Sequence, residues 1–153
     1  MASTLAQMRT KVRTYLSESS ARFFTNAELN QYINAAYNEY TIQIIQSGQD
    51  YFKKLDNLDL VANQARYDLS ALFPDFFLAS QIRRITPYGT IPLKWDERRY
   101  IPTYTTPSFT DSYYTPTVRR MGVNIQFDPP PTFSETDAMS VEYYYTPASL
   151  VND

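Results

Sequence analysis

The chain has 153 residues, 43% hydrophobic and 20% charged, which are the length and apolar content of one domain with a single core. It contains no cysteine and no histidine, so disulfide bonds, thiolate nucleophiles and Ser-His-Asp triads are excluded. The net charge of −2 gives no global basic excess for nucleic acid or for a membrane surface. No apolar run is long enough for a signal peptide or a spanning helix, so we expect a soluble protein made in a cytoplasm.

A short helix is predicted near the start of the chain, in the stretch STLAQMRTKVRTYL. Apolar residues recur there at steps of three and four, which gathers them into one stripe on a helix surface. The polar residues 17–20 then interrupt the pattern. The stripe consists of Leu5, Met8, Val12, Tyr15 and Leu16.

A second helix is predicted from Asn26 to Ser47, with clear signals at both ends. Thr25 is a typical N-cap, and Glu28 three residues later completes a capping box. Gly48 follows the last helical turn, where a C-cap glycine is common.

The second helix carries an apolar stripe of its own, so the two helices are predicted to form an antiparallel hairpin over residues 1–48. Phe24 lies just before the cap and is placed to form a hydrophobic staple with Leu29. Tyr37 and Tyr40 are assigned to the core. Tyr32 lies about 100° from Ile33, at the edge of the stripe, so we assign it to a neighbouring subunit. The stripe consists of Leu29, Ile33, Ala36, Tyr37, Tyr40 and Ile44.

From residue 49 onwards the pattern changes to short strands. One hairpin is predicted around Tyr88-Gly89 and a second bend at Gly122. The last strand, MSVEYYY, places Val141, Tyr143 and Tyr145 on one face.

Residues 96–117 show no period and contain no glycine, so they are predicted to form a long loop. The fold class that follows is α+β. We expect one domain over residues 1–153, with the helical hairpin at 1–48 and a small, mostly antiparallel β part at 49–153.

No residues of the chain form a recognisable catalytic, cofactor or metal site. Three glycines, separated along the chain, cannot form a phosphate-binding loop. Carboxylates occur close together at Asp56 and Asp59 and at Asp96 and Glu97, but their spacing does not match a calcium loop. They are therefore interpreted as solvated surface acids.

Three pairs of neighbouring arginines occur in the β part. Adjacent residues of a strand point to opposite faces, so no more than one member of each pair faces a given surface. Two interpretations stay open: a ring of arginines facing a nucleic-acid backbone or a partner's carboxylates, and ordinary surface ion pairs. The pairs are Arg83 and Arg84, Arg98 and Arg99, and Arg119 and Arg120.

Tyrosine is abundant, with 14 residues, and it favours both protein interfaces and strands. The tyrosines at 143–145 lie in a predicted strand, so one face of that strand belongs to the core. Tyr113 and Tyr114 lie in the predicted long loop without an evident core role, and are the better interface candidates.

The order of these signals resembles the head-to-tail adaptor proteins of tailed bacteriophages, in particular the podovirus-type adaptors below the portal. The second helix of that family begins with a phrase matched here by Phe24, Thr25, Glu28, Leu29, Ile33, Asn34 and Ala36. A Tyr-x-Leu phrase matches Tyr67 to Leu69, with its proline arriving later in Leu72-Phe73-Pro74-Asp75-Phe76. The two last phrases match Ile125 to Pro131 and Tyr144 to Leu150.

The resemblance implies a non-enzymatic virion protein of the phage neck, without a cofactor. Its expected partners are the portal protein, tail or nozzle proteins and further copies of itself in a ring, which the resemblance implies to be dodecameric. Packaged DNA passes through the centre and is contacted without sequence specificity, and no membrane is involved. Arg83, Arg84, Arg119 and Arg120 are candidates for the DNA channel or a partner. Candidates for the subunit or portal interface are Tyr32, Arg98, Arg99, Tyr100, Tyr104, Tyr113 and Tyr114.

Two alternatives stay open. A head-completion stopper or tail-terminator protein of the same neck would use the long loop as a channel plug. A carbohydrate-binding or carbohydrate-cleaving tail module would use tyrosines and acids, but Trp95 is the single tryptophan available for stacking on a sugar.

Overall fold

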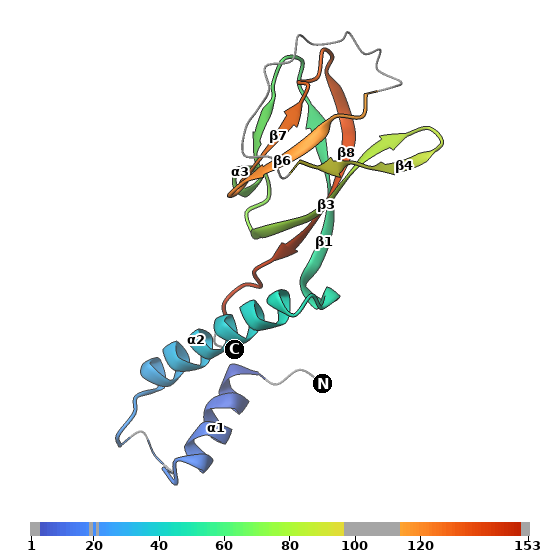
Figure 1. Ribbon diagram of the computed structural model, residues 1–153. Coiled ribbons are helices and arrows are strands. Elements are labelled where there is room, and N and C mark those ends of the chain that lie inside the picture. Colours follow the sequence, from blue (N-terminus) through green and yellow to red (C-terminus); the bar gives the residue numbers. More distant parts are fainter. Residues whose placement is uncertain (1–3, 19, 21, 97–113, 151–153) are drawn as a thin grey trace. The chain divides into compact units, whose positions relative to one another are not determined.

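The computed structural model describes residues 4–18, 20, 22–96 and 114–150 (Figure 1). The chain divides into two compact units. A helical unit comprises Met1–Phe52 together with Thr146–Asp153, and a β unit comprises Lys53–Tyr145. The helical unit thus extends four residues past the helical hairpin expected at residues 1–48 and includes the segment that follows Tyr145. The single-domain organisation stays a prediction.

The helical unit contains α1 (Leu5–Tyr15), α2 (Asn26–Gln46) and the short 3₁₀ helix η1 (Asp50–Phe52). The predicted capping box at Thr25 is confirmed, and α1 begins with a second capping box at Thr4 that the sequence reading missed. Ser47 is the C-cap of α2, and Gly48 follows with φ +75°, a left-handed conformation that glycine adopts without steric cost.

The buried positions of α2 differ from the predicted stripe. Leu29, Thr41 and Ile45 are buried, whereas Tyr40 is 63% exposed and Ala36 is also exposed. The assignment of Tyr40 to the core is therefore wrong. The buried residues lie four or a multiple of four positions apart, and each step of four advances about 40° past a full turn. Together with the half-buried residues they occupy one side of the helix, about 160° wide, which is displaced from the predicted stripe and leaves Ala36 outside it and Tyr40 at its edge. The half-buried residues are Asn30, Ile33, Asn34, Tyr37 and Ile44.

The β unit consists of two four-stranded sheets. The first has the order β1-β8-β3-β4, with β1 (Lys53–Leu60), β8 (Glu135–Tyr145), β3 (Phe76–Thr86) and β4 (Gly89–Pro92). All of its neighbouring strands are antiparallel. Figure 1 shows the β3–β4 hairpin extending from this sheet. Its two-residue turn, Pro87-Tyr88, lies directly before Gly89 and confirms the hairpin predicted around Tyr88-Gly89.

The second sheet has the order β2-β7-β6-β5. Its strands are β2 (Arg66–Asp68), β7 (Asn124–Asp128), β6 (Thr117–Met121) and β5 (Lys94–Trp95), and the short helix α3 (Leu69–Leu72) follows β2. The β6–β7 hairpin turns at Gly122, as predicted, with φ +66°. The β5–β6 pair is parallel and the other pairs of this sheet are antiparallel.

One hydrophobic core joins the two sheets of the β unit. From the first sheet it takes Leu58, Leu60, Ile82, Met139, Val141 and Tyr143, and from the second Tyr67, Val118, Ile125 and Phe127. Val141 and Tyr143 lie in this core as predicted, and Tyr145 packs against it partly buried. The class α+β with mostly antiparallel strands is thereby confirmed.

Candidate interaction surfaces

The start of α2 is held by its capping box. The Thr25 amide donates to Glu28 Oε2 at 2.8 Å, and the Glu28 amide donates to Thr25 Oγ1 at 3.2 Å. The bonds from the Thr25 amide and hydroxyl lower the pKa of the Glu28 carboxyl. Phe24 meets the ring of Tyr32 edge-on, with centroids 6.5 Å apart, and its predicted staple with Leu29 stays a prediction.

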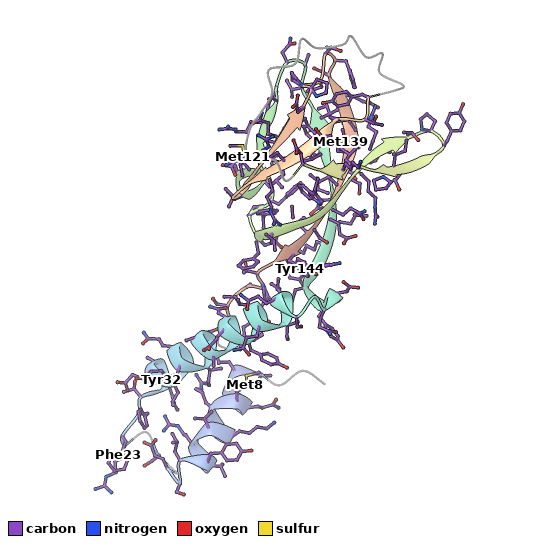
Figure 2. The ribbon with its side chains drawn as sticks, in the orientation of Figure 1. Met8, Phe23, Tyr32, Met121, Met139 and Tyr144 are labelled. Carbon is purple, nitrogen blue, oxygen red and sulfur yellow. The ribbon has the colours of Figure 1, made fainter. Side chains whose placement is uncertain are left out.

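The turn between α1 and α2 is organised by Glu18, which is only 7% exposed. Its Oε1 accepts from the amides of Phe23 at 2.7 Å and Phe24 at 3.3 Å, and its Oε2 lies 3.1 Å from Arg13 Nη1. The Phe23 amide is the main cause of the lowered pKa of this carboxyl. Phe23 itself is left 76% exposed (Figure 2).

Two arginines of α1 bind asparagines of α2. Arg9 Nη1 donates to Asn30 Oδ1 at 3.1 Å, and Arg13 Nη2 donates to Asn26 Oδ1 at 3.0 Å. The later residue of α1 meets the earlier residue of α2, which is the order expected of helices running in opposite directions.

A further bond pair attaches the end of the chain to α2. The Leu150 amide donates to Asn34 Oδ1 at 2.7 Å, and Asn34 Nδ2 donates to the Leu150 carbonyl at 3.3 Å. Asn34 and Leu150 belong to two of the four phrases of sequence on which the resemblance depends. Their pattern is therefore explained by a structural contact within the helical unit.

The helical unit exposes large aromatic and aliphatic side chains around this framework. Tyr32 is 62% exposed, which an interface residue requires, and Tyr15 is 87% exposed. Figure 2 shows Phe23 and Tyr32 near the start of α2. We call this set the helical-unit surface: Tyr15, Leu16, Phe23, Tyr32 and Tyr40.

The structure corrects the expectation for Arg84. This side chain is 5% exposed, donates to the Ala138 carbonyl at 2.8 Å and forms an ion pair with Glu135. Its guanidinium also lies over the ring of Phe133, 5.7 Å from the centroid. A guanidinium held this way within the β unit cannot face DNA, so Arg84 is a structural residue.

The other described arginines of the pairs differ in their surroundings. Arg119 Nη2 lies 3.0 Å from Asp96 Oδ2, and both side chains are largely buried. Asp96 is therefore not the solvated surface acid that was predicted, and Arg119 is held within the β unit, although it was a candidate for the DNA channel or a partner. Arg83 lies 3.5 Å from Glu142 and remains partly exposed. Arg120 is exposed and donates to the Ala79 carbonyl at 3.3 Å.

Tyr114 is a core residue rather than a surface residue. It is 2% exposed, its hydroxyl donates to the Pro129 carbonyl at 2.8 Å, and its ring meets Phe133 edge-on. Burial raises the pKa of its hydroxyl. Its neighbours in the sequence gave no sign of this role, because the core contacts come from distant strands. The other candidates of this region lie outside the described residues: Arg98, Arg99, Tyr100, Tyr104 and Tyr113.

A polar cluster in the β unit was missed by the sequence reading. The buried Tyr143 hydroxyl lies 2.7 Å from Asp56 Oδ2 and 3.1 Å from Asp75 Oδ1, and Lys54 forms an ion pair with Asp75. Burial, followed by the two carboxylates, raises the pKa of Tyr143. The cluster opens into a hollow of about 610 Å³ that is also lined by Phe73. Asp56 is therefore more than a solvated acid.

No group of three or more Asp or Glu side chains in the described part of the chain is arranged to hold a metal ion. No helix among the described residues is both long and apolar enough to cross a membrane.

The comparison with protein families agrees with the structural character of these sites. A family model described as SU10 adaptor protein matches residues 3–153, which is almost the whole chain. No curated protein matches the chain. Because the match covers the helical unit and the β unit alike, the chain belongs to the SU10 adaptor protein family, and is a structural adaptor protein of a phage virion.

Proposed function

We propose that this chain is a head-to-tail adaptor of the podovirus type that forms a ring, about twelvefold in the pattern of the resemblance, beneath the portal. The ring links the portal protein above to tail or nozzle proteins below and surrounds the channel through which packaged DNA passes. Assembly takes place in the cytoplasm of the host bacterium.

The observation that carries this proposal is the helical-unit surface. Tyr15, Phe23 and Tyr32 are each more than 60% exposed, and rigid aromatic side chains of this kind contribute large contact areas at low entropic cost. The Arg13–Glu18 pair holds the turn that presents Phe23, so the surface is organised before a partner arrives.

Two finer predictions belong to the same proposal. The pairing of α1 and α2 as an antiparallel hairpin is supported by the bonds of Arg9 and Arg13 to the asparagines of α2. A contact between basic side chains and channel DNA is proposed for the exposed Arg120 and the partly exposed Arg83. The five candidates at residues 98–113 remain predictions for the subunit or portal interface.

The test is assembly with the portal protein of the same phage. The purified proteins are mixed, separated by size-exclusion chromatography and imaged by cryo-electron microscopy. Co-migration and a ring of this chain directly below the portal are expected. Failure to co-migrate under all assembly conditions would contradict the proposal, and a ring further from the portal would instead identify a stopper or tail terminator.

A further inference from the structure

One face of α2 is exposed along most of the helix. Its members repeat at steps of three and four, and at about 100° per residue they lie within roughly 140° of arc. Two alanines lie between tyrosines, which leaves room for the backbone of another helix to approach. We call this the Tyr32 face, and all of its members are exposed: Glu28, Tyr32, Ala35, Ala36, Glu39, Tyr40 and Gln43.

The α1 helix of the same chain occupies a different side of α2. Its arginines bind Asn26 and Asn30. Asn30 precedes Tyr32 by two residues, which places the two side chains about 160° apart around the helix. The Tyr32 face is therefore open to another partner while α1 keeps its contacts within the chain.

The two helices have opposite charge. Between Asn26 and Gln46 the chain has two glutamates and no lysine or arginine, whereas Leu5–Tyr15 has three basic residues and no acidic one. Arg9 and Arg13 are bound to α2 within the chain. Lys11 is exposed, as is Glu39 on the Tyr32 face, and within the described part of the chain neither has an ion-pair partner.

Lys11 belongs to an outward row of α1. Gln7, Lys11 and Tyr15 follow one another at steps of four, so their side chains lie above one another on the helix surface. All three are exposed, and Tyr15 is 87% exposed. The row presents a cation and an aromatic ring, and the Tyr32 face presents carboxylates, aromatic rings and small residues.

We propose that the Gln7–Lys11–Tyr15 row of one copy docks on the Tyr32 face of a second copy, with Lys11 facing Glu39. The proposal rests on the ring function proposed above and names the surfaces that join its subunits. The contact is heterologous because the two surfaces differ, and repetition of one heterologous contact closes a ring when the rotation allows it. Each α2 then packs against α1 of its own chain on one side and α1 of a neighbour on another.

Site-directed cross-linking tests the contact directly, because the natural chain has no cysteine. Gln7→Cys and Ala36→Cys are made as separate proteins, mixed, and treated with a short bismaleimide. The matched control replaces Ala36→Cys by Asn38→Cys, an exposed position of α2 about 160° away. We expect several-fold more cross-linked heterodimer with Ala36→Cys, both in the free protein at high concentration and on the portal. Equal yields in both settings overturn the proposal, as does cross-linking of Ala36→Cys to the portal protein alone.

A charge-swap experiment distinguishes the loss of this contact from a general loss of structure. Lys11→Glu and Glu39→Lys are each expected to weaken self-association several-fold in sedimentation velocity, and the double variant is expected to recover it. Circular dichroism checks that all three fold. Loss without recovery in the double variant contradicts the Lys11–Glu39 pairing.

The outcomes also separate this inference from the proposed function. If rings form on the portal but cross-linking is not enriched, the named contact surfaces are refuted and the proposed adaptor role is retained. If cross-linking is enriched but the protein does not bind the portal, the named contact surfaces are supported and the proposed adaptor role is refuted.

Discussion

Asn34 forms two hydrogen bonds with the backbone of Leu150. Its Oδ1 accepts from the Leu150 amide at 2.7 Å, and its Nδ2 donates to the Leu150 carbonyl at 3.3 Å. An asparagine amide is suited to this role because it carries a donor and an acceptor side by side. The two residues are 116 positions apart in the chain. The contact thus attaches the segment after β8 to the middle of α2.

Replacing Asn34 by leucine is expected to release that segment. The two neutral hydrogen bonds to Leu150 are lost, together with the bond from Asn34 Nδ2 to the Asn30 carbonyl at 3.0 Å. Their loss corresponds to about 1–3 kcal/mol of stability in the helical unit. Amide hydrogen exchange at Leu150 should accelerate, as measured by NMR. The control is Asn38→Leu at an exposed position of the same helix, and equal exchange at Leu150 in the two variants would refute the role of Asn34.

Arg84→Met is expected to destabilise the β unit by about 2–4 kcal/mol, because it leaves the Ala138 carbonyl without its donor and Glu135 without its cation. Methionine keeps an unbranched apolar stem in the same place. Urea denaturation followed by Trp95 fluorescence measures the change. The exposed Arg120 provides the comparison, and Arg120→Met should cost less than about 1 kcal/mol. Similar losses for the two variants would contradict the structural assignment of Arg84.

The Tyr143 hydroxyl gives a third prediction. Tyr143→Phe keeps the ring stacked on Phe73, with centroids 5.1 Å apart, but removes the donor from Asp56 and Asp75. A loss of about 2 kcal/mol is expected, since hydrogen bonds to charged groups are stronger than neutral ones. Chemical denaturation is the measurement, with the fully exposed Tyr88→Phe as the matched change. A neutral effect at Tyr143 would show that the two carboxylates do not depend on the hydroxyl.

The lowered pKa of Glu18 leads to a prediction of how the stability of the helical unit depends on pH. The amides of Phe23 and Phe24, together with Arg13, hold its pKa below the ordinary value of 4.5. A group with a lowered folded pKa stabilises the fold above its unfolded pKa, and that contribution is lost as the pH falls through the folded pKa. Thermal unfolding measured by circular dichroism should therefore show decreasing stability of the natural chain below about pH 4.5.

Glu18→Gln should flatten this acid dependence, because glutamine does not titrate. It should also lower the midpoint temperature at neutral pH, since the ion pair with Arg13 is lost. Lys11→Gln removes an exposed charge from the same unit and serves as the control. An unchanged slope in Glu18→Gln would mean that other carboxylates determine the acid response.

Tyr32→Ala is expected to fold and yet to fail in joining the ring. The side chain is 62% exposed and its truncation removes the edge-on contact with Phe24, so stability should fall by no more than about 1 kcal/mol. Assembly on the portal is assessed by electron microscopy. Tyr51→Ala, at a 78% exposed tyrosine of η1, is expected to assemble normally. Normal assembly of Tyr32→Ala would show that this side chain is dispensable at the interface.

The sequence predicted helix starts and turns correctly where the residues that determine them lie within a few positions of one another. The capping box of Thr25 and Glu28 determines the start of α2, because donor and acceptor are three positions apart. Gly122 and the pair Tyr88-Gly89 determine two hairpin turns in the same way. The absence of cysteine and histidine likewise limits the available chemistry directly.

The tertiary structure decided which polar and aromatic residues are buried, and there the sequence reading failed at Tyr40, Arg84 and Tyr114. Arg84 enters the β unit because Ala138 and Glu135, more than fifty positions away, satisfy its guanidinium. Tyr114 is covered by residues near Pro129. Tyr40 is left exposed because the covered side of α2 is displaced from the stripe that the sequence predicted. Propensity and capping depend on neighbours in the chain, whereas burial depends on contacts that only folding brings together. The sequence alone therefore determined the helices, turns and family pattern of this adaptor, and the tertiary structure determined which side chains remain exposed for other proteins.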